Sequence, residues 1–200
     1  SAASDVYKRQ TVELSNLQRQ ILHKESRLGQ NKAVSAAKSL HGLNAQVHVQ
    51  TYSQFMDEAH LRQVLPDYDI VIDATDQLEN KFLINDVCVS AEKPFVHGGI
   101  TGFSGQVMTY VSEKGPCYRC IFGEVPEDNA PAPIPVIGVT AGIIGTIQAA
   151  EAIRYLLGIP SLLTGKLLVL DGLRMQFRTV PFPHVSEHCP LHTRKGVTDL

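Results

Sequence analysis

The chain of 200 residues has little net charge, no long apolar run and few cysteines. Its net charge of -2 gives no reason to expect nucleic acid or an anionic membrane as a partner. The most apolar stretch, residues 134–147, is interrupted by Pro135, Gly138, Gly142 and Gly145, well short of the roughly 18 apolar residues of a membrane-spanning helix. The first ten residues lack the apolar core of a secretory signal. We therefore expect a cytoplasmic globular protein of one domain.

Only four cysteines occur, and two of them form a C-x-x-C pair at Cys117 and Cys120. In a chain without a secretory signal, this spacing favours a metal site over a disulfide framework. A second pair with the same spacing, Cys189 and His192, would complete the tetrahedral shell of Zn²⁺. We expect a closed, structural zinc site that joins the C-terminal tail to the body of the domain. His188 is the alternative fourth ligand.

Helix and strand patterns alternate along the chain. Helical patterns cover residues 30–41, 57–65, 78–91 and 137–157. Strand patterns cover residues 46–52, 70–72, 94–97, 105–111, 166–171 and 175–180. This alternation predicts an α/β fold with a doubly wound, Rossmann-like and mostly parallel sheet, extended by antiparallel strands after His97. Cys88, in the third helical pattern, is expected to be a buried core residue.

The segment 11–32 is short, polar and rich in groups that suit phosphate. It contains Asn16, Arg19 and Lys32. An arginine offers a rigid fork of donors that matches phosphate oxygens, and a lysine adds a compact positive charge. A solvated loop that leads into a helix is the alternative interpretation of these cations.

A second polar stretch follows the buried strand pattern at 70–72. The sequence D-A-T-D runs from Asp73 to Asp76, at the kind of strand end where open α/β sheets bind ligands. Asp76 would hold Mg²⁺ while the cations of segment 11–32 neutralise a triphosphate. Asp73 is the weaker candidate because it lies closer to the strand interior. A helix N-cap is the alternative role of Asp76.

These stretches resemble the ThiF/MoeB/HesA family, the bacterial relatives of ubiquitin-activating enzymes. The resemblance rests on S-N-L-Q-R-Q at 15–20, G-Q-x-K at 29–32, D-A-T-D at 73–76 and C-x-x-C at 117–120. It extends from residue 12 to about residue 192, and the family pattern selects Asp76 over Asp73 as the functional aspartate. Two departures are mild, because Gln77 stands where the family has asparagine and Lys81 where an arginine is common.

The resemblance implies an adenylation reaction that serves thiamine or molybdopterin biosynthesis. The C-terminal Gly-Gly carboxylate of a ubiquitin-like sulfur-carrier protein of the ThiS/MoaD type would attack the α-phosphate of ATP, and pyrophosphate would leave. No general base is needed for a carboxylate nucleophile, so His23 and His97 are interpreted as structural. The implied catalytic residues are Arg19, Lys32 and Asp76. The implied residues for ATP and Mg²⁺ are Ser15, Asn16, Leu17, Gln18, Arg19, Lys32, Asp76 and Gln77.

The resemblance also implies partners. The active unit of the family is a homodimer, and the Gly-rich helix at 137–157 would form a dimer face or a close packing contact. Residues 123–135 are expected to form a mobile crossover loop, in which sulfur-transferring relatives place a cysteine. This loop contains none, and Pro131 stands near that position. We therefore expect the chain to adenylate its carrier and to leave sulfur delivery to a separate persulfide donor, such as a cysteine desulfurase.

Residues 1–10 do not match the family and are expected to be a non-native leader. Residues 11–200 would then be a ThiF-type adenylation domain without its N-terminal Gly-rich segment, and the family's acidic residue for the ATP ribose would fall near Lys8. A non-catalytic, zinc-stapled module that binds a carrier protein is the competing hypothesis. An NAD-dependent oxidoreductase would need a G-x-G-x-x-G fingerprint, which the sequence lacks.

Overall fold

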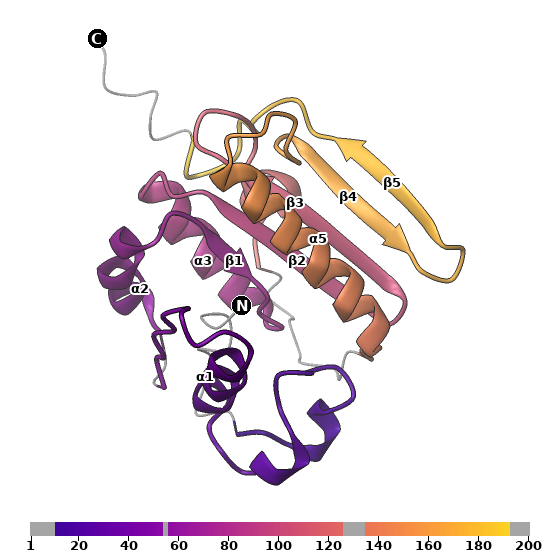
Figure 1. Ribbon diagram of the computed structural model, residues 1–200. Helices are drawn as coiled ribbons and strands as arrows, with labels where there is room; N and C mark the ends of the chain where they lie inside the picture. Colours follow the sequence, from indigo (N-terminus) through magenta and orange to yellow (C-terminus); the bar gives the residue numbers. More distant parts are fainter. Residues whose placement is uncertain (1–10, 54–55, 126–134, 193–200) are drawn as a thin grey trace.

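The computed structural model describes residues 11–53, 56–125 and 135–192 (Figure 1). Its helices are α1 (Lys32–Leu43), α2 (Glu58–Val64), α3 (Leu78–Ser90), α4 (Tyr118–Phe122) and α5 (Gly138–Leu156). Its strands are β1 (Val71–Asp73), β2 (Phe95–Thr101), β3 (Ser104–Tyr110), β4 (Lys166–Asp171) and β5 (Gln176–Pro181). Short 3-10 turns cover Leu14–Asn16, Glu25–Arg27 and Leu65–Asp67. The predicted leader and Pro131 lie outside the described residues.

The five described strands form one mixed sheet in the order β1-β2-β3-β4-β5. Only β1 and β2 pair in parallel, and the other three pairs are antiparallel. The expected antiparallel additions are confirmed, whereas the expectation of a mostly parallel sheet is wrong for the described strands. The reason is local, because a two-residue turn at Gly102-Phe103 joins β2 to β3 and the Asp171-Gly172 turn region joins β4 to β5. Strands joined by tight turns can only pair antiparallel.

Helices cover both faces of the sheet, as a doubly wound fold requires. Phe95 and Met108 point to the face that packs against α3 and the residues around Cys117 and Cys189, in one apolar cluster. Val96 and Val107, their neighbours along the strands, point to the opposite face and pack with Ile144 of α5. Figure 1 shows α5 lying across that face. The α/β class and the two-layer cover predicted from the alternating patterns are therefore confirmed.

Most predicted elements occur within a few residues of their expected bounds, but the strand expected at 46–52 does not form. Val47 in this stretch is 52% exposed, and the described sheet begins at β1. An alternating pattern becomes a strand only when a neighbouring strand pairs with its backbone. Among the described residues, no helix has both the length and the apolar composition needed to cross a membrane.

Candidate functional site

The carboxyl ends of β1 and β2 form the edge of the sheet toward which the polar motifs converge. The two strands run in parallel with Asp73 opposite His97, so D-A-T-D and the end of β2 lie at the same edge. The N–H of Gly102, just after β2, donates to the carbonyl of Pro135 at 2.7 Å. This contact brings the start of α5 to the same edge, which we call the ligand edge.

Segment 11–31 is attached to the ligand edge through the start of α5. The segment closes on itself, because the N–H of Val12 donates to the carbonyl of Gln30 at 2.8 Å. Nε2 of Gln18 donates to the carbonyl of Val136 at 3.1 Å. Gly138 opens α5, and a Cβ there would collide with the carbonyl oxygen of Gln18. Only glycine permits this approach, so S-N-L-Q-R-Q is held against the start of the helix.

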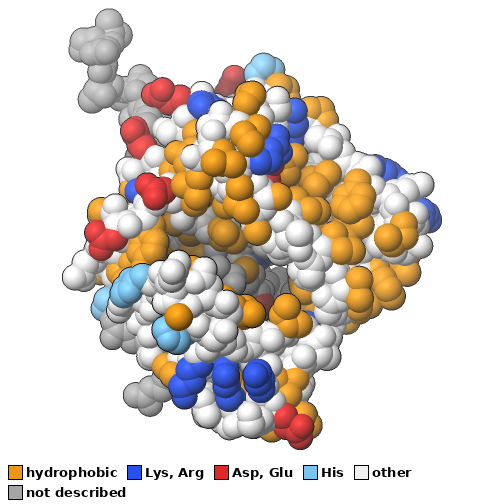
Figure 2. Space-filling model, in the orientation of Figure 1, with side chains coloured by type: hydrophobic (Ala, Val, Ile, Leu, Met, Phe, Trp, Pro, Cys, Tyr) orange, Lys and Arg blue, Asp and Glu red, His pale blue; other side chains and the backbone are white. Residues whose placement is uncertain are grey.

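The molecule is hollowed between the part that contains α1 and segment 11–31 and the part that contains the sheet and α5 (Figure 2). Arg19 is partly exposed, and its Nη1 donates to the carbonyl of Ser15 at 3.2 Å. Lys32 is buried and opens α1, whose N-cap is Asn31. Asp76 is exposed between β1 and α3. Arg19 and Asp76 belong to different elements, and within the described residues no hydrogen bond or ion pair joins them.

The remaining predicted nucleotide residues lie on the same two stretches. Ser15 and Gln18 are exposed, Leu17 and Gln77 are half-buried, and Asn16 is only 7% exposed. Nδ2 of Asn16 donates to Oγ of Ser15 at 3.2 Å. Oδ1 of Asn16 and Oε1 of Gln20 are buried and accept no hydrogen bond within the described residues. A buried acceptor without a donor costs about 1–3 kcal/mol.

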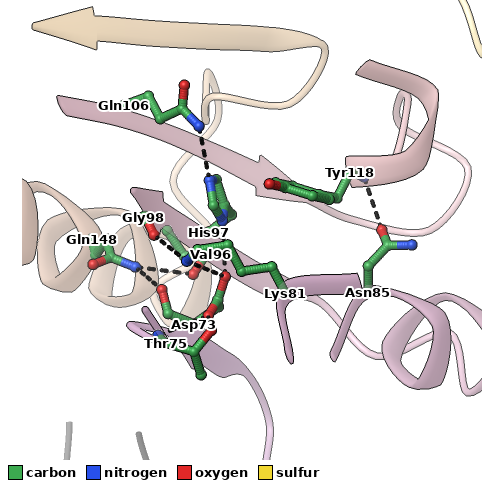
Figure 3. A network of polar contacts seen from close by, with 10 residues as sticks. All are labelled: Asp73, Thr75, Lys81, Asn85, Val96, His97, Gly98, Gln106, Tyr118 and Gln148. Carbon is green, nitrogen blue, oxygen red and sulfur yellow. Dashed lines mark hydrogen bonds and ion pairs between the residues drawn. The ribbon is translucent and has the colours of Figure 1, made fainter. Parts of the chain in front are cut away.

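Behind the ligand edge, three buried residues form a charged network that sequence reasoning did not identify (Figure 3). Nδ1 of His97 lies 2.8 Å from Oδ2 of Asp73, and Nζ of Lys81 lies 3.3 Å from the same oxygen. Burial alone would raise the pKa of Asp73, but the charge of Lys81 and the bond from His97 outweigh it and hold the pKa below its ordinary value. Burial lowers the pKa of His97 and keeps the imidazole neutral.

A sequence signal for this network existed. Asp73 directly follows one predicted strand and His97 ends the next, and parallel pairing places such strand ends side by side. The bond between them depends on the register, which the sequence pattern does not give. His97 is fully buried and bonded to Asp73, so its structural interpretation agrees with the structure.

The two halves of the predicted zinc site come together at the other side of this network. One ligand atom from each of Cys117, Cys120, Cys189 and His192 lies within 4.8 Å of the others. Sγ of Cys117 is 3.7 Å from Sγ of Cys120 and 3.7 Å from Sγ of Cys189. A tetrahedron with Zn–S bonds of about 2.3 Å has edges of about 3.8 Å, so the arrangement fits zinc. His188, the alternative ligand, is exposed and not part of this group.

Local structure explains why these residues meet. Cys117 is the N-cap of α4, and Cys120 follows within its first turn. The tail folds into a second turn, in which the N–H of His192 donates to the carbonyl of Cys189 at 3.1 Å. A hydrogen bond from Cys117 lowers the pKa of the Cys120 thiol to about 5, so this sulfur is ready to bind a cation as a thiolate. Tyr118 of α4 packs its ring 4.6 Å from the ring of His97, between centroids.

Comparison with known proteins places this architecture in a family. The chain is 41% identical over 195 residues to the "SAMP-activating enzyme E1" of Haloferax volcanii, covering 94% of this chain and 70% of that protein. It is 40% identical over 172 residues to the "Adenylyltransferase and sulfurtransferase MOCS3" of Culex quinquefasciatus, covering 84% of this chain and 39% of that protein. The chain therefore spans well under half the length of the MOCS3 relative.

Solved structures share the fold. The E. coli MccB structure with ATP superposes with a TM-score of 0.80 over 92% of this chain and 57% of that chain, at 21% identity. The E. coli MccB structure with MccA-N7isoASN gives the same TM-score at 20% identity, over 92% of this chain and 58% of that chain. The ThiF family model matches residues 5–191. The chain belongs to the ThiF family.

Proposed function

We propose that this domain adenylates the C-terminal carboxylate of a ubiquitin-like sulfur-carrier protein with ATP. One observation carries the proposal: S-N-L-Q-R-Q is held against the start of α5 at the ligand edge, the edge at which the exposed carboxylate of Asp76 follows β1. The names of the relatives, an E1 and an adenylyltransferase, support the same chemistry. The MOCS3 names also support a carrier that receives sulfur.

Arg19 and Lys32 are the residues that we assign to the phosphates. Their positive charges offset the repulsion that a triphosphate presents to an incoming carboxylate. A carboxylate oxygen then attacks the α-phosphorus, the bond to the β-phosphate oxygen breaks, and pyrophosphate leaves with its electron pair.

The proposed reaction needs no side chain as a base, because a carboxylate is already a nucleophile. His97 is fully buried behind the ligand edge and already donates to Asp73. The site's task is to hold two anions together and to offset their charge. We assign Asp76 to Mg²⁺, which when bound neutralises phosphate charge and orients the oxygens.

The cysteines of the chain suggest that sulfur comes from another protein. Three of the four lie in the metal cluster, where we propose that Cys117, Cys120, Cys189 and His192 hold structural Zn²⁺. The fourth, Cys88, is buried, and burial raises the pKa of its thiol to about 12. A buried thiol that stays protonated is a poor nucleophile. We therefore propose that a separate persulfide donor, such as a cysteine desulfurase, receives the activated carrier.

We also propose that the domain works as a homodimer through the outer face of α5. Val139 on this helix and Leu157, its C-cap residue, are 71% and 69% exposed, and Ile153 and Leu156 are exposed as well. Gly142 lies between them with open space at its Cβ position. Large apolar groups exposed along one helix are typical of an interface. Sedimentation of the parent and of Ile153→Glu tests this assignment, with a dimer expected for the parent and a monomer for the variant. A parent protein that sediments as a monomer would contradict it.

The adenylation proposal is tested by ATP–pyrophosphate exchange with a purified Gly-Gly-ended sulfur-carrier protein and Mg²⁺. We expect exchange that depends on the carrier and falls by roughly 100-fold or more in Arg19→Ala and Asp76→Asn, because each loses charge compensation at the reacting phosphates. Carriers of the ThiS and MoaD types, compared in the same assay, separate thiamine from molybdopterin biosynthesis.

Matched controls come from exposed residues of the same kind. Arg62→Ala on α2 and Asp69→Asn before β1 should keep full exchange, because both side chains lie on exposed positions away from the ligand edge. A protein that binds the carrier but shows no exchange would contradict the proposal and favour a non-catalytic binding module. Equal losses in Arg19→Ala and Arg62→Ala would contradict the assignment of the site.

A further inference from the structure

The carboxylate of Asp73 is buried at the end of β1 and accepts hydrogen bonds on both oxygens. Oδ1 accepts from the backbone N–H of Thr75 at 3.0 Å and from its Oγ1 at 2.7 Å. Oδ2 accepts from His97 and Lys81. These four donors match the roughly four acceptor positions of a carboxylate, and the residue is 2% exposed. Asp73 therefore has no oxygen left over to bind a metal or a nucleotide.

The donors to Asp73 join three elements of the fold. His97 comes from β2, and Lys81 comes from the first turns of α3. Nζ of Lys81 also donates to the carbonyl of Gly98 at 2.8 Å. Lys81 is thus bound to the ends of both parallel strands at once. Because Asp73 and Lys81 are the two charges of this buried site, removing either one would leave the other uncompensated.

These hydrogen bonds fix the position of both ends of the loop that carries Asp76. At its start, Asp73 and Thr75 form a turn in which the side chain bonds the backbone two residues on. At its end, Lys81 follows one helical turn after Gln77, whose carbonyl accepts from the N–H of Lys81 at 3.3 Å. Asp76 lies between these two fixed points. The single carboxylate of Asp73 therefore determines the path of the backbone on both sides of Asp76.

A further layer of amides holds the network from behind (Figure 3). Nε2 of Gln148, from α5, donates to the carbonyl of Asp73 at 2.7 Å and to the carbonyl of Val96 at 3.2 Å. Nε2 of Gln106, from β3, lies 3.3 Å from Nε2 of His97. The amide of Gln106 can only donate there, so the imidazole proton resides on Nδ1 and points to Asp73. Every polar neighbour thus favours one orientation of the carboxylate.

We propose that Asp73 is a positioning residue, which holds the loop 73–77 so that Asp76 presents its carboxylate to a divalent cation at the ligand edge. This inference rests on the proposed function, where Asp76 is assigned to Mg²⁺. The same argument makes Lys81 the partner that completes the positioning, since it fixes the far end of the loop.

The test compares Asp73→Asn with Asp69→Asn, an exposed carboxylate that precedes β1. In Asp73→Asn the side chain keeps its size but presents an amide to Lys81 or His97 in place of an oxygen. The Mg²⁺ concentration that gives half-maximal carrier-dependent exchange should rise by about 10–100-fold, the usual effect of residues that orient a metal ligand. Exchange at saturating Mg²⁺ should stay within roughly threefold of the parent, because the phosphate-binding cations are intact.

Lys81 provides a rescue experiment. Lys81→Met should show the same rise in the Mg²⁺ requirement, and Lys81→Arg should restore most of the parent value, because a guanidinium keeps the charge and the donors. A merely structural network would lower the unfolding temperature of all these variants without changing the Mg²⁺ requirement of the folded fraction. If Asp73→Asn fails to fold, Thr75→Val removes one donor from Oδ1 and tests the same turn.

A second readout separates this inference from the adenylation proposal. Binding of Mn²⁺ in the presence of a non-hydrolysable ATP analogue, followed by the electron spin resonance of free Mn²⁺, needs no turnover. A parent protein that binds Mn²⁺ with the analogue but never exchanges pyrophosphate would contradict adenylation, while weaker Mn²⁺ binding by Asp73→Asn would still support positioning. The inference is overturned if Asp73→Asn and Asp69→Asn have the same Mn²⁺ affinity and the same Mg²⁺ requirement for exchange. It is also overturned if the parent binds no Mn²⁺ in the presence of the analogue.

Discussion

The cluster of Cys117, Cys120, Cys189 and His192 and the ligand edge are joined through His97. They differ in whether their side chains already lie together in the absence of a ligand. The cluster gathers four donor atoms within 4.8 Å, and two of its cysteines are buried. The ligand edge keeps Arg19 and Asp76 on separate elements, with the oxygen of Asn16 buried and unpaired. Tyr118 packs on His97 from one side, and Asp73 binds it from the other.

On the proposed assignments, this difference separates residues that maintain the fold from residues that bind substrate. A closed tetrahedral shell around the proposed zinc would leave no position for a reactant, so its binding free energy would hold the tail against the body. The proposed nucleotide site has its charges on separate elements, and we expect a bound polyanion to complete it. Changes in the cluster should therefore lower stability, and changes at the edge should lower activity while the fold persists.

The largest effect should follow from breaking the metal cluster. Cys117→Ser, or removal of the ion with a chelator, should lower the free energy of unfolding by several kcal/mol, roughly 3–5 by analogy with other lost structural ligands. The reason is that the tail loses its attachment to α4. Metal analysis should give one zinc per chain for the parent, and thermal unfolding with and without chelator measures the loss.

The two candidate histidines provide the control for that experiment. His188 is exposed and lies outside the group of four, whereas His192 is part of it. His188→Ala should therefore retain zinc and the parent unfolding temperature, and His192→Ala should lose both. The reverse result would show that the tail is bound differently from the arrangement described, and an absence of zinc in the parent would refute the metal assignment.

The sequence predicted more of the cysteine and histidine cluster than of the ligand edge. The cluster was predictable because C-x-x-C and C-x-x-H are local spacings that a single turn can satisfy, and the structure places these four residues together. The placement of S-N-L-Q-R-Q against the start of α5, by contrast, depends on Gly138 and the carbonyl of Gln18, a contact between distant parts of the chain. Sequence patterns give the spacing of residues along the chain, but they do not show which distant backbone segments come into contact.

The fold shows the same limit. The apolar run Ile70-Val71-Ile72 correctly predicted a strand, which forms as β1 over Val71–Asp73, although these three apolar residues are half-buried rather than fully buried. The alternating stretch 46–52 predicted a strand that does not form, because its partner is not among the described strands. Likewise, Asp73 seemed a weaker candidate at the end of β1, and only the register with His97 shows what it binds. Long-range pairing was the missing information in each case.

An intermediate effect should follow from separating segment 11–31 from α5. In Gly138→Ala the added Cβ meets the backbone of Gln18 and Arg19, so the segment must shift. We expect a loss of about 1–3 kcal/mol in the free energy of unfolding and a larger loss of ATP–pyrophosphate exchange, because Arg19 moves with the segment.

The matched control is Gly142→Ala, one turn further along the same helix. A Cβ at Gly142 meets no atom within 4 Å, and alanine is favoured over glycine in a helix by about 1 kcal/mol. Gly142→Ala should therefore raise the unfolding temperature while Gly138→Ala lowers it. Equal shifts in the two variants would show that the close approach at Gly138 has no role in holding the segment.

The smallest effect concerns the histidine that joins the two regions. Because burial lowers the pKa of His97, the folded protein binds fewer protons than the unfolded chain below the ordinary histidine pKa near 6.5. Its contribution to stability is therefore complete above about pH 6.5 and is lost as the pH falls below that value. The groups that face the imidazole are Asp73 on β1, Lys81 on α3 and the ring of Tyr118 on α4. The pKa of Asp73 is lowered, so its own contribution is lost only below about pH 4.

Replacing His97 with asparagine keeps a donor for Asp73 but removes the titrating ring. His97→Asn should be less stable than the parent at pH 8, because the contact with Tyr118 is lost. The difference should shrink by about 1 kcal/mol between pH 6.5 and pH 5, where only the parent loses the contribution of a neutral, buried imidazole. Urea unfolding of both zinc-loaded proteins across this range measures it, with exposed His41→Asn as the control. Parallel stability curves for the parent and His97→Asn would mean that the pKa of His97 is the same in the folded and unfolded protein, and would contradict the lowering expected from its burial.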